Sequence, residues 1–388
     1  MKHPTAPLPV TVITHEFFPM MGGIATFVEE MASALHAQGH PTEVWAPATF
    51  TPLERRFPFT IRRIPIKGTQ GFFCQLRMAQ EVFKHRTDLS DRIVYLPEPG
   101  PLLALAYMRA MRMFRPSRLV LTFHGTEVNS LSTRPFARPV LDRLVRAADR
   151  VSCLSRFTGS LVEKYLPSAR GKIVITPGAV RAHFARMPAT HSPRSHKVVI
   201  VTVARLHPRK GQLHVLEALN LLPDHVLKDV EYWIIGRSVR GNYEARLRRK
   251  AAHARCAVTF HGNIDHDDLE LIYRRADIFA LTSVNHKHSV EGFGLAYLEA
   301  SAFGLPVVGF DVGGVSEAVQ NGRTGLLVPE RDIPALAAAL ERLIRDAALR
   351  RQLGEAGARW VAGHSWPQSA RILLDGISHA PNGAQPSA

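Results

Sequence analysis

Short segments with strand character alternate with longer helical segments along almost the whole chain. We predict a strand at Val10–Thr14, a helix at Gly23–Gln38 and a second strand at Thr42–Ala46. Further strands are predicted at Ile93–Leu96, Leu119–Phe123, Arg150–Cys153, Ile173–Thr176, Val198–Ala204, Val230–Ile235, Val258–Phe260, Ile278–Leu281 and Pro306–Phe310. Further helices are predicted at Pro101–Phe114, Pro135–Ala148, Phe157–Tyr165, Leu213–Leu221, Asn242–Ala254, Leu269–Arg275, Leu295–Ala302 and Ile333–Asp346. This alternation predicts an α/β fold whose parallel sheets are covered by helices on both faces.

One polar stretch interrupts the alternation and divides the chain. Residues Arg186–Lys197 contain two prolines and few apolar side chains, which is typical of a linker. A chain of 388 residues is also too long for one ordinary hydrophobic core. We therefore expect two doubly wound domains, 1–185 and 195–365, that face a cleft, because such sheets bind ligands at the carboxyl ends of their strands. The tail 381–388 is expected to be disordered.

The composition is that of a globular protein. Hydrophobic residues make up 46% of the chain, its mean hydropathy is −0.04, and its apolar runs are too short for a transmembrane helix. The run Leu8–Ile13 is short and contains a proline, so it fits a first buried strand better than a secretory signal. Cys74, Cys153 and Cys256 lie far apart and form no metal or redox motif. These features predict a cytoplasmic protein with reduced cysteines.

Positive charge is concentrated in the first half of the chain. The net charge is +16. Residues 1–190 carry 25 basic and 13 acidic side chains, whereas residues 191–388 carry 24 and 20. A basic half suggests an anionic partner such as a membrane surface, a nucleic acid or a phosphorylated substrate, and a diffusely solvated basic surface explains it equally well. No nucleic-acid partner is expected, because the chain has no recognition motif that combines aromatic and basic residues.

The segment Glu291–Glu299 carries the strongest chemical signal. Its two terminal carboxylates are separated by a turn, formed by Gly292, Phe293 and Gly294, and by a helix predicted to begin at Leu295. The glycines allow the backbone to approach a ligand closely. The helix start offers N–H groups and a positive dipole end to an anion such as a diphosphate. The two carboxylates can then meet different parts of an extended ligand, which is the layout of a sugar nucleotide.

Two further loops contain groups that suit a diphosphate. Arg205 and Lys210 follow the predicted strand Val198–Ala204, where two cations beside a cleft can neutralise phosphates. Gly22 and Gly23 precede the first long helix and permit a tight turn with bare N–H groups. A solvated basic loop and a plain turn between strand and helix are the alternatives for these two loops.

A histidine follows one of the predicted strands of the first domain. His124 comes directly after Leu119–Phe123, at the edge where a cleft is expected. An imidazole there can hydrogen-bond a sugar hydroxyl or take part in proton transfer. A structural histidine is the alternative, because the chain contains 19 histidines.

Three other motifs are weaker. The run Asp265–Asp268 contains a D-x-D pattern that binds metal in other transferases, but helix capping before Leu269 explains it better, so no metal is expected. The loop Gly236–Gly241 resembles half of a phosphate-binding loop and lacks the Lys-Ser/Thr pair. The helix around Arg109 and Arg112 places basic residues beside apolar ones, which suits an anionic bilayer or a half-buried position in the first domain.

In their order along the chain, these motifs resemble those of glycosyltransferase family 4, the retaining transferases with the GT-B fold. The resemblance spans nearly the whole chain and is most specific from Glu291 to Val308. The other matching segments are Gly22–Ile24, Gly39-His40, Thr122–Gly125, Val151–Ser155, Val203–Arg205, Lys210-Gly211, Gly313–Glu317 and Asn321–Val328. The resemblance implies two Rossmann-like domains that face a cleft, with a C-terminal helix at 366–380 that crosses back to the first domain.

The resemblance also implies roles for individual side chains. Glu299 would accept hydrogen bonds from the ribose hydroxyls of the nucleotide, and Glu291 would lie beside the donor sugar. Arg205 and Lys210 would hold the leaving diphosphate. His124 would lie near the sugar. With these two cations and a helix dipole supplying positive charge, no metal or other cofactor is expected.

The second domain would bind most of the nucleotide. The donor-binding positions implied by the resemblance are Gly22, Gly23, Ile264, Gly292, Phe293, Gly294, Leu295 and Glu299. The chain departs from the family pattern at Gly236–Ser238, where a Gly-x-Gly-Pro turn is common, and at Glu127, where Asp is commoner. The first departure affects the loop expected to contact the base.

These residues predict a hexosyltransferase that moves a sugar from a nucleotide diphosphate sugar to an acceptor hydroxyl with retention of configuration. The run Tyr297–Ser301 resembles the phosphatidylinositol mannosyltransferase branch, which favours GDP-mannose over a UDP-sugar. The acceptor would be a lipid-linked glycan, polysaccharide or glycolipid, and the protein would be cytoplasmic or peripheral on the inner face of the plasma membrane. A nucleotide-sugar 2-epimerase and a catalytically silent sugar-nucleotide-binding subunit are the alternatives.

Overall fold

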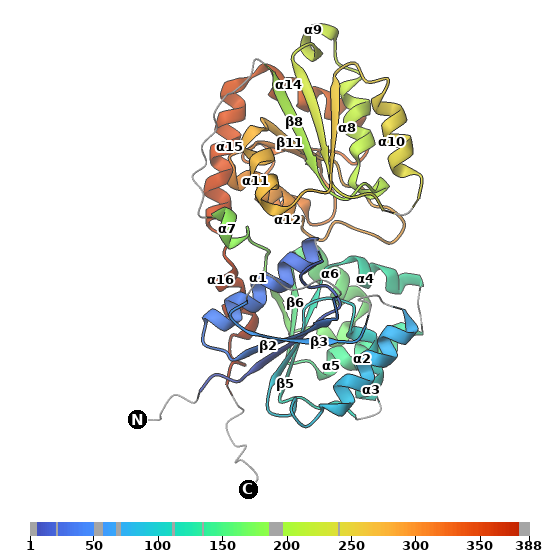
Figure 1. Cartoon of the computed structure of the whole chain (residues 1–388), viewed down its shortest axis with the longest axis vertical. Helices are drawn as coiled ribbons and strands as arrows, with labels where there is room; N and C mark the ends of the chain where they lie inside the picture. The colour runs from blue at the N-terminus through green and yellow to red at the C-terminus, as the bar shows by residue number, and fades with distance from the viewer. Residues whose placement is uncertain are drawn as a thin grey trace. The chain divides into compact units, whose positions relative to one another are not determined.

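The chain folds into two compact units, which Figure 1 shows as ribbons. Unit 1 comprises 1–178 and 365–388, and unit 2 comprises 179–364, so residues 179–185 belong to unit 2 rather than to the first domain as drawn from the sequence. Most of the predicted linker and the tail 381–388 lie outside the described residues. The structure is a computed structural model that describes residues 6–20, 22–49, 57–66, 71–110, 113–133, 136–185, 197–239 and 241–379.

Unit 1 contains a seven-stranded parallel sheet with the strand order β3-β2-β1-β4-β5-β6-β7. Its strands are β1 (Val10–Ile13), β2 (Thr42–Pro47), β3 (Thr60–Ile64), β4 (Ile93–Leu96), β5 (Arg118–Phe123), β6 (Arg150–Cys153) and β7 (Ile173–Ile175). Its helices are α1 (Gly23–Ala37), α2 (Phe72–Lys84), α3 (Leu102–Ala110), α4 (Thr126–Asn129), α5 (Ala137–Ala147), α6 (Arg156–Tyr165) and α16 (Trp366–Leu374). The strand order reverses direction between β1 and β4.

Unit 2 contains a six-stranded parallel sheet with the order β10-β9-β8-β11-β12-β13. Its strands are β8 (Val198–Val203), β9 (Val230–Ile235), β10 (Ala257–Gly262), β11 (Ile278–Leu281), β12 (Val307–Phe310) and β13 (Gly325–Val328). Its helices are α7 (Ala182–Ala185), α8 (Gln212–Leu219), α9 (Asp224–Leu227), α10 (Tyr243–Ala251), α11 (His266–Arg275), α12 (Leu295–Ala302), α13 (Val315–Ala318), α14 (Ile333–Arg345) and α15 (Ala347–Ala362).

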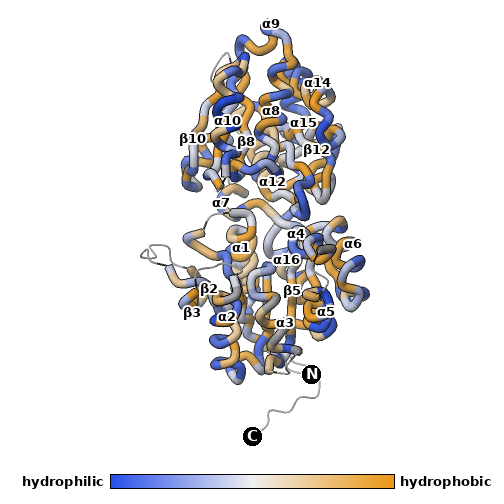
Figure 2. Tube along the Cα trace, turned by 90° about the vertical axis from the view of Figure 1, so that its right-hand side faces the viewer, coloured by the Kyte–Doolittle hydropathy of each residue, from blue (hydrophilic) through white to orange (hydrophobic). Residues whose placement is uncertain are grey.

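The central strands are apolar on both faces because helices cover both faces of each sheet. Every residue of β1, β4, β11 and β12 is buried. Figure 2 shows hydrophobic and hydrophilic stretches alternating along the elements of both units. The predicted α/β fold is therefore confirmed, and strands β4, β6, β9 and β11 have the bounds that the sequence predicts.

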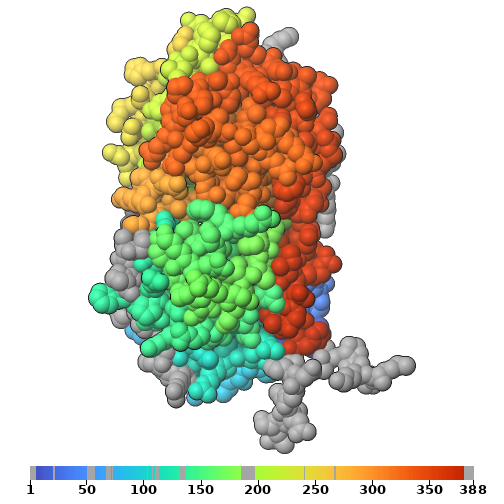
Figure 3. All heavy atoms as spheres, turned by 180° about the vertical axis from the view of Figure 1, so that it is seen from behind, coloured from blue at the N-terminus to red at the C-terminus, as the bar shows by residue number. Residues whose placement is uncertain are grey.

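The C-terminal helix α16 completes the core of unit 1. Trp366 is 3% exposed, and the centroid of its ring lies 5.5 Å from that of Phe27 in α1. Two hydrogen bonds fix the helix further: Gln38 donates to the carbonyl of Pro367 at 2.6 Å, and Ser369 donates to the carbonyl of Pro177 at 2.7 Å. Figure 3 shows this red segment against the other atoms of unit 1. The last described helix of the chain thus packs against the first.

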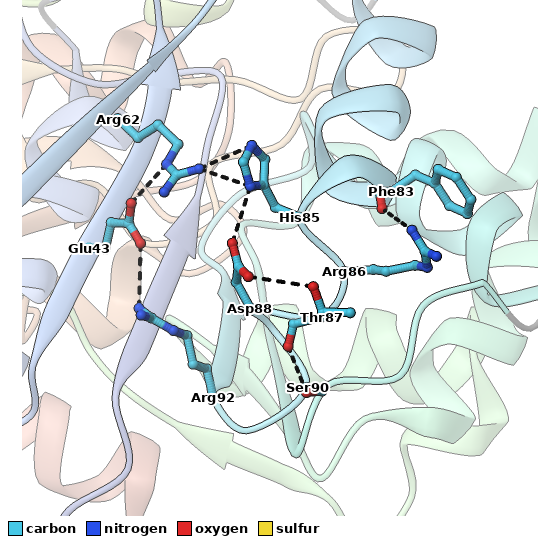
Figure 4. A network of polar contacts seen from close by, with 9 residues as sticks. All are labelled: Glu43, Arg62, Phe83, His85, Arg86, Thr87, Asp88, Ser90 and Arg92. Atoms are coloured by element: carbon cyan, nitrogen blue, oxygen red, sulfur yellow. Dashed lines mark hydrogen bonds and ion pairs between the residues drawn. The ribbon is translucent and has the colours of Figure 1, made fainter.

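A network of hydrogen bonds and ion pairs attaches the end of α2 to the edge of the sheet in unit 1 (Figure 4). Arg62 in β3 donates to Glu43 in β2 at 2.9 Å and lies 3.2 Å from the ring nitrogens of His85, just after α2. Asp88 contacts the same ring at 3.2 Å, and Arg92 contacts Glu43 at 3.4 Å. Strand β3 and helix α2 were not predicted from the sequence.

The helix that carries Arg109 occupies a half-buried position, which was one of its two sequence interpretations. Met108 is 2% exposed, and Arg109 donates to the carbonyl of Phe114 at 2.9 Å. Arg112 lies outside the described residues. Within the described parts of the chain, no helix combines the length and the apolar composition needed to cross a membrane.

Candidate active site

The strand order of unit 2 places two loops at one point on the carboxyl edge of its sheet. β8 and β11 are neighbours, and the chain leaves them in opposite directions, toward β9 and toward β12. Such a switch point leaves a crevice where ligands of doubly wound sheets bind. The loop after β8 contains Arg205 and Lys210, and the loop after β11 contains Ser283 and Glu291.

Glu291 is the centre of a buried polar cluster between these loops. Its side chain is 9% exposed, and one carboxylate oxygen accepts three hydrogen bonds. The donors are Lys210 Nζ at 2.5 Å, Ser283 Oγ at 2.7 Å and Arg209 Nη1 at 3.0 Å. A buried carboxylate needs such donors, because an unpaired charge is unstable away from water.

The cluster remains ionised near neutral pH. Burial raises the pKa of Glu291, but the charges of Lys210 and Arg209 outweigh it and lower this pKa to about 2. Burial lowers the pKa of Lys210 to about 8, although Glu291 opposes the shift. Below about pH 8, the cluster therefore carries two positive charges, on Lys210 and Arg209, and one negative charge, on Glu291. Its net positive charge can attract a further anion.

Arg209 is a member of the cluster that the sequence analysis missed. Its guanidinium contacts Glu291 and also donates to the carbonyl of Val290 at 3.1 Å. The predicted Arg205 is exposed, yet its charge also lowers the pKa of Lys210, so it lies near the same group. The sequence feature that could have identified Arg209 is its position directly beside Lys210, in a short loop that also contains Arg205.

The turn after Glu291 leads into α12 as the sequence predicts. Phe293 is 3% exposed, and Gly294 has φ = 94°, a left-handed conformation that favours glycine. A Cβ atom at Gly294 would lie 2.5 Å from the ring of Tyr297. Among the described residues, no side chain caps this helix start. The first turn of α12 therefore begins without a hydrogen bond from its N-cap side chain, and the N–H of Tyr297 donates to the carbonyl of Gly294 at 3.1 Å.

Glu299, the second carboxylate, lies on α12 and faces the segment that leads into α7. Arg181 lies 3.7 Å from one carboxylate oxygen, and the hydroxyl of Tyr273 donates to the other at 3.3 Å. Burial raises the pKa of Glu299, and Arg181 and Tyr273 oppose that rise. The sequence analysis missed Arg181 because it lies far from α12 in the chain.

A cavity of about 230 Å³ lies at the same edge of the sheet. Gly236, Arg237 and Ser238, the loop that departs from the family pattern, line it together with Phe260 and Asn263. Ile264, the position predicted to lie near the base, follows Asn263 and is half-buried. The loop Gly236–Ser238, although it differs from the family pattern, therefore borders a cavity next to the position predicted to lie near the base.

Unit 1 brings a second group of predicted residues to the carboxyl edge of its own sheet. His124 follows β5, and its Nε2 atom lies 2.8 Å from the carbonyl oxygen of Pro97, which follows the neighbouring strand β4. The ring of Phe27 meets the His124 ring edge-on at 5.3 Å. Gly22 and Gly23 are exposed at the start of α1, and apart from the adjacent chain no atom of the described residues lies within 4 Å of a Cβ built at either of them.

The acidic run after β10 has the capping role that the sequence favours. Asp265 is the N-cap of α11, and its carboxylate accepts a hydrogen bond from the backbone N–H of Asp268 at 2.9 Å. Within the described residues, no group of three or more His, Cys, Asp and Glu side chains is arranged to hold a metal ion.

Two family models match the chain, one for each half. The model for Glycosyltransferase Family 4 matches residues 21–184, and the model for Glycosyl transferases group 1 matches residues 185–360. Together with the two parallel sheets covered by helices, these matches define a nucleotide-sugar glycosyltransferase with the GT-B fold.

Relatives cover nearly the full length of the chain. A GDP-mannose-dependent alpha-(1-6)-phosphatidylinositol monomannoside mannosyltransferase of Mycobacterium tuberculosis is 30% identical over 94% of this chain and 97% of its own. A glycogen synthase of the same organism is 31% identical, with 92% of this chain and 91% of its own covered. Among solved structures, a sucrose-phosphate synthase from Thermosynechococcus elongatus has a TM-score of 0.75 and 22% identity, with 94% and 96% covered. The chain belongs to glycosyltransferase family 4 and is a hexosyltransferase.

Proposed function

We propose that the enzyme transfers mannose from GDP-mannose to a hydroxyl group of a membrane glycolipid, with retention of configuration and without a metal ion. The observation that carries the proposal is the cluster of Lys210, Arg209 and Glu291 at the switch point of unit 2, next to the start of α12. A nucleotide diphosphate carries the anionic charge that such a cluster can bind.

The chemical role of the cluster follows from where charge develops in the reaction. As the bond between the sugar and the diphosphate breaks, negative charge grows on the leaving phosphate oxygens. Fixed cations and helix N–H groups stabilise that charge without having to reorganise. Lys210, Arg209 and Arg205 would supply the cations, and the backbone from Gly294 to Leu295 would supply N–H groups. In the proposal, these groups take the place of a divalent metal ion. Undiminished activity in the presence of a metal chelator would support this part of the proposal.

The donor and acceptor in the proposal are supported by a relative rather than by a bound ligand. The mycobacterial mannosyltransferase that is 30% identical is described as GDP-mannose-dependent and as acting on a phosphatidylinositol monomannoside. A glycogen synthase is equally similar, so the donor needs direct measurement. Thermal stabilisation by GDP-mannose, UDP-glucose and ADP-glucose ranks the donors, and the anomeric configuration of the product tests retention.

A membrane acceptor is also supported by the exposed side of α2, here called the α2 face. It consists of Phe73, Leu76, Arg77, Phe83 and Lys84, all of which are exposed. Phe73 is 79% exposed. Aromatic and aliphatic side chains next to basic ones suit the surface of an anionic bilayer. We therefore propose peripheral association with anionic membranes through this face.

Substitutions in the cluster test the proposed reaction. Lys210→Ala and Glu291→Ala are each expected to reduce turnover by ~100-fold or more, the usual cost of removing a group that stabilises developing charge. Lys197→Ala is the matched control, because Lys197 forms a 2.9 Å ion pair with Glu231 at the opposite, amino end of the same strands. Full activity of either cluster variant, or an equal loss in the control, would contradict the assignment.

A further inference from the structure

The turn after β4 in unit 1 contains a buried carboxyl group with no role in the site so far. Glu98 is 1% exposed. One of its oxygens accepts hydrogen bonds from the backbone N–H of His15 at 2.7 Å and from the hydroxyl of Thr14 at 3.3 Å. The other accepts from the backbone N–H of Gly100. Glu98 therefore ties the end of β1 to the turn after β4.

The packing around this carboxyl group leaves no spare room. A Cβ atom at Gly100 would lie 2.5 Å from a carboxylate oxygen of Glu98 and 2.7 Å from the ring of His15. Burial raises the pKa of Glu98 to about 7, and the N–H groups of His15 and Gly100 oppose that rise. A group held this tightly, at a position where burial disfavours its charge, fixes the backbone around it.

The same turn also determines which nitrogen of His124 carries a proton. The carbonyl oxygen of Pro97 lies 2.8 Å from His124 Nε2, and a carbonyl oxygen can only accept a hydrogen bond. Nε2 must therefore carry the hydrogen. In the neutral ring, Nδ1 is then the acceptor. Phe27 packs edge-on against the ring and limits its rotation.

We propose that Glu98 is a positioning residue for His124. By fixing the turn from Pro97 to Gly100 against the end of β1, it holds the Pro97 carbonyl where it selects the Nε2–H form of His124. The Nδ1 atom is then available to accept a hydrogen bond from a sugar hydroxyl. Only this last step rests on the proposed function, because the tautomer is a property of unit 1 alone.

Histidine nitrogen spectra test the positioning step without any substrate. In the protein labelled with ¹⁵N-histidine, two-bond ¹H–¹⁵N spectra distinguish the tautomers, and the His124 signal is assigned by its loss in His124→Asn. The wild type is expected to show the Nε2–H form. Glu98→Gln keeps the side-chain size but replaces one acceptor oxygen by an NH₂ group, and Gly100→Ala displaces the carboxyl group by contact. Both are expected to increase the Nδ1–H form.

A matched control separates positioning from a general loss of stability. Asp149 is another carboxylate of unit 1, and it accepts from the backbone N–H of Leu119 at 2.8 Å and from Arg118 at 3.0 Å. Asp149→Asn should leave the His124 tautomer unchanged. An unchanged tautomer in both Glu98→Gln and Gly100→Ala, or an equal change in the control, would overturn the proposal.

Kinetics then test the consequence for the reaction. Glu98→Gln is expected to lower turnover by about 10- to 100-fold, the scale of a misplaced group in an active site, while the dissociation constant for the nucleotide stays within about twofold. The proposed diphosphate cluster of Lys210, Arg209 and Glu291 belongs to unit 2, whereas the hydrogen bonds of Glu98 described above are all made within unit 1. A parallel loss of nucleotide affinity would count against the inference. A wild-type enzyme without transferase activity would refute the proposed function and leave the tautomer result to decide the positioning role.

Discussion

Lys210 and Glu291 retain their charges in a buried position because each lies against the other. Removing Glu291 would leave the charge of Lys210 buried without its carboxylate, which costs more than the pair itself contributes. The pair also differs from a purely structural ion pair, because Arg209 adds a second cation to the same carboxylate oxygen. The excess positive charge is what a diphosphate would meet.

The lowered pKa of Lys210 predicts a loss of activity in mild alkali. Its folded pKa is about 8, below the usual value for lysine, so the side chain becomes neutral as the pH rises through that value. The kcat/KM for the donor should therefore fall above about pH 8, since this parameter reports the free enzyme.

Lys210→Arg provides the test of that assignment. A guanidinium stays charged in alkali, so the alkaline limb of the pH profile should move to higher pH even if the maximal rate decreases. The measurement is kcat/KM from pH 6 to about 10 in both proteins. Identical alkaline limbs would show that another group titrates.

Much of the site was predictable from sequence because its residues follow strands. Arg205, Lys210 and Glu291 come after predicted strands of one parallel sheet, whose strands end at one edge, and His124 comes after a predicted strand of the other sheet. Arg181 could not be predicted, since only the folded chain brings it to Glu299. Glu98 was missed for a related reason: its partners at the end of β1 lie 83 and 84 positions away in the chain.

At the scale of elements, β3 and α2 lacked the usual sequence signals. β3 is an edge strand with two adjacent arginines and only one buried residue, so it has no apolar run. The helix α2 leaves Phe73, Leu76 and Phe83 exposed. The ion pair of Arg62 with Glu43 and its hydrogen bonding to His85 connect β3 with β2 and with the end of α2 (Figure 4).

The α2 face predicts selective binding to anionic vesicles. Phe73→Asp combined with Phe83→Asp should reduce flotation with phosphatidylglycerol vesicles at least tenfold, because burying each phenylalanine is worth roughly 2 kcal/mol. Leu221→Asp is the control, since Leu221 is 58% exposed in unit 2. High salt should weaken wild-type binding. Equal binding to neutral vesicles, or an equal effect of the control, would contradict a membrane role for this face.

At the scale of the molecule, α16 belongs to unit 1 although it follows the whole of unit 2 in sequence. Trp366→Ala should therefore destabilise unit 1 by about 3–5 kcal/mol, as expected for removing a buried tryptophan. Hydrogen exchange read by mass spectrometry should show faster exchange in peptides of unit 1 and unchanged exchange in unit 2.

Trp360→Ala is the matched control for that experiment. Trp360 is a half-buried tryptophan on α15, and its substitution should affect unit 2 only. Faster exchange in both units after Trp366→Ala would mean that the two units unfold together and that α16 does not belong to unit 1 alone.

The packing of α16 on α1 has a consequence for biosynthesis. A ribosome releases α1 early and α16 only after all of unit 2 has emerged. The contact between Phe27 and Trp366 can therefore form only near the end of translation. Unit 2 can reach its native state on the nascent chain, whereas unit 1 must remain incomplete until elongation is nearly over. In the cell, we therefore expect chaperones to bind the incomplete amino-terminal half during translation.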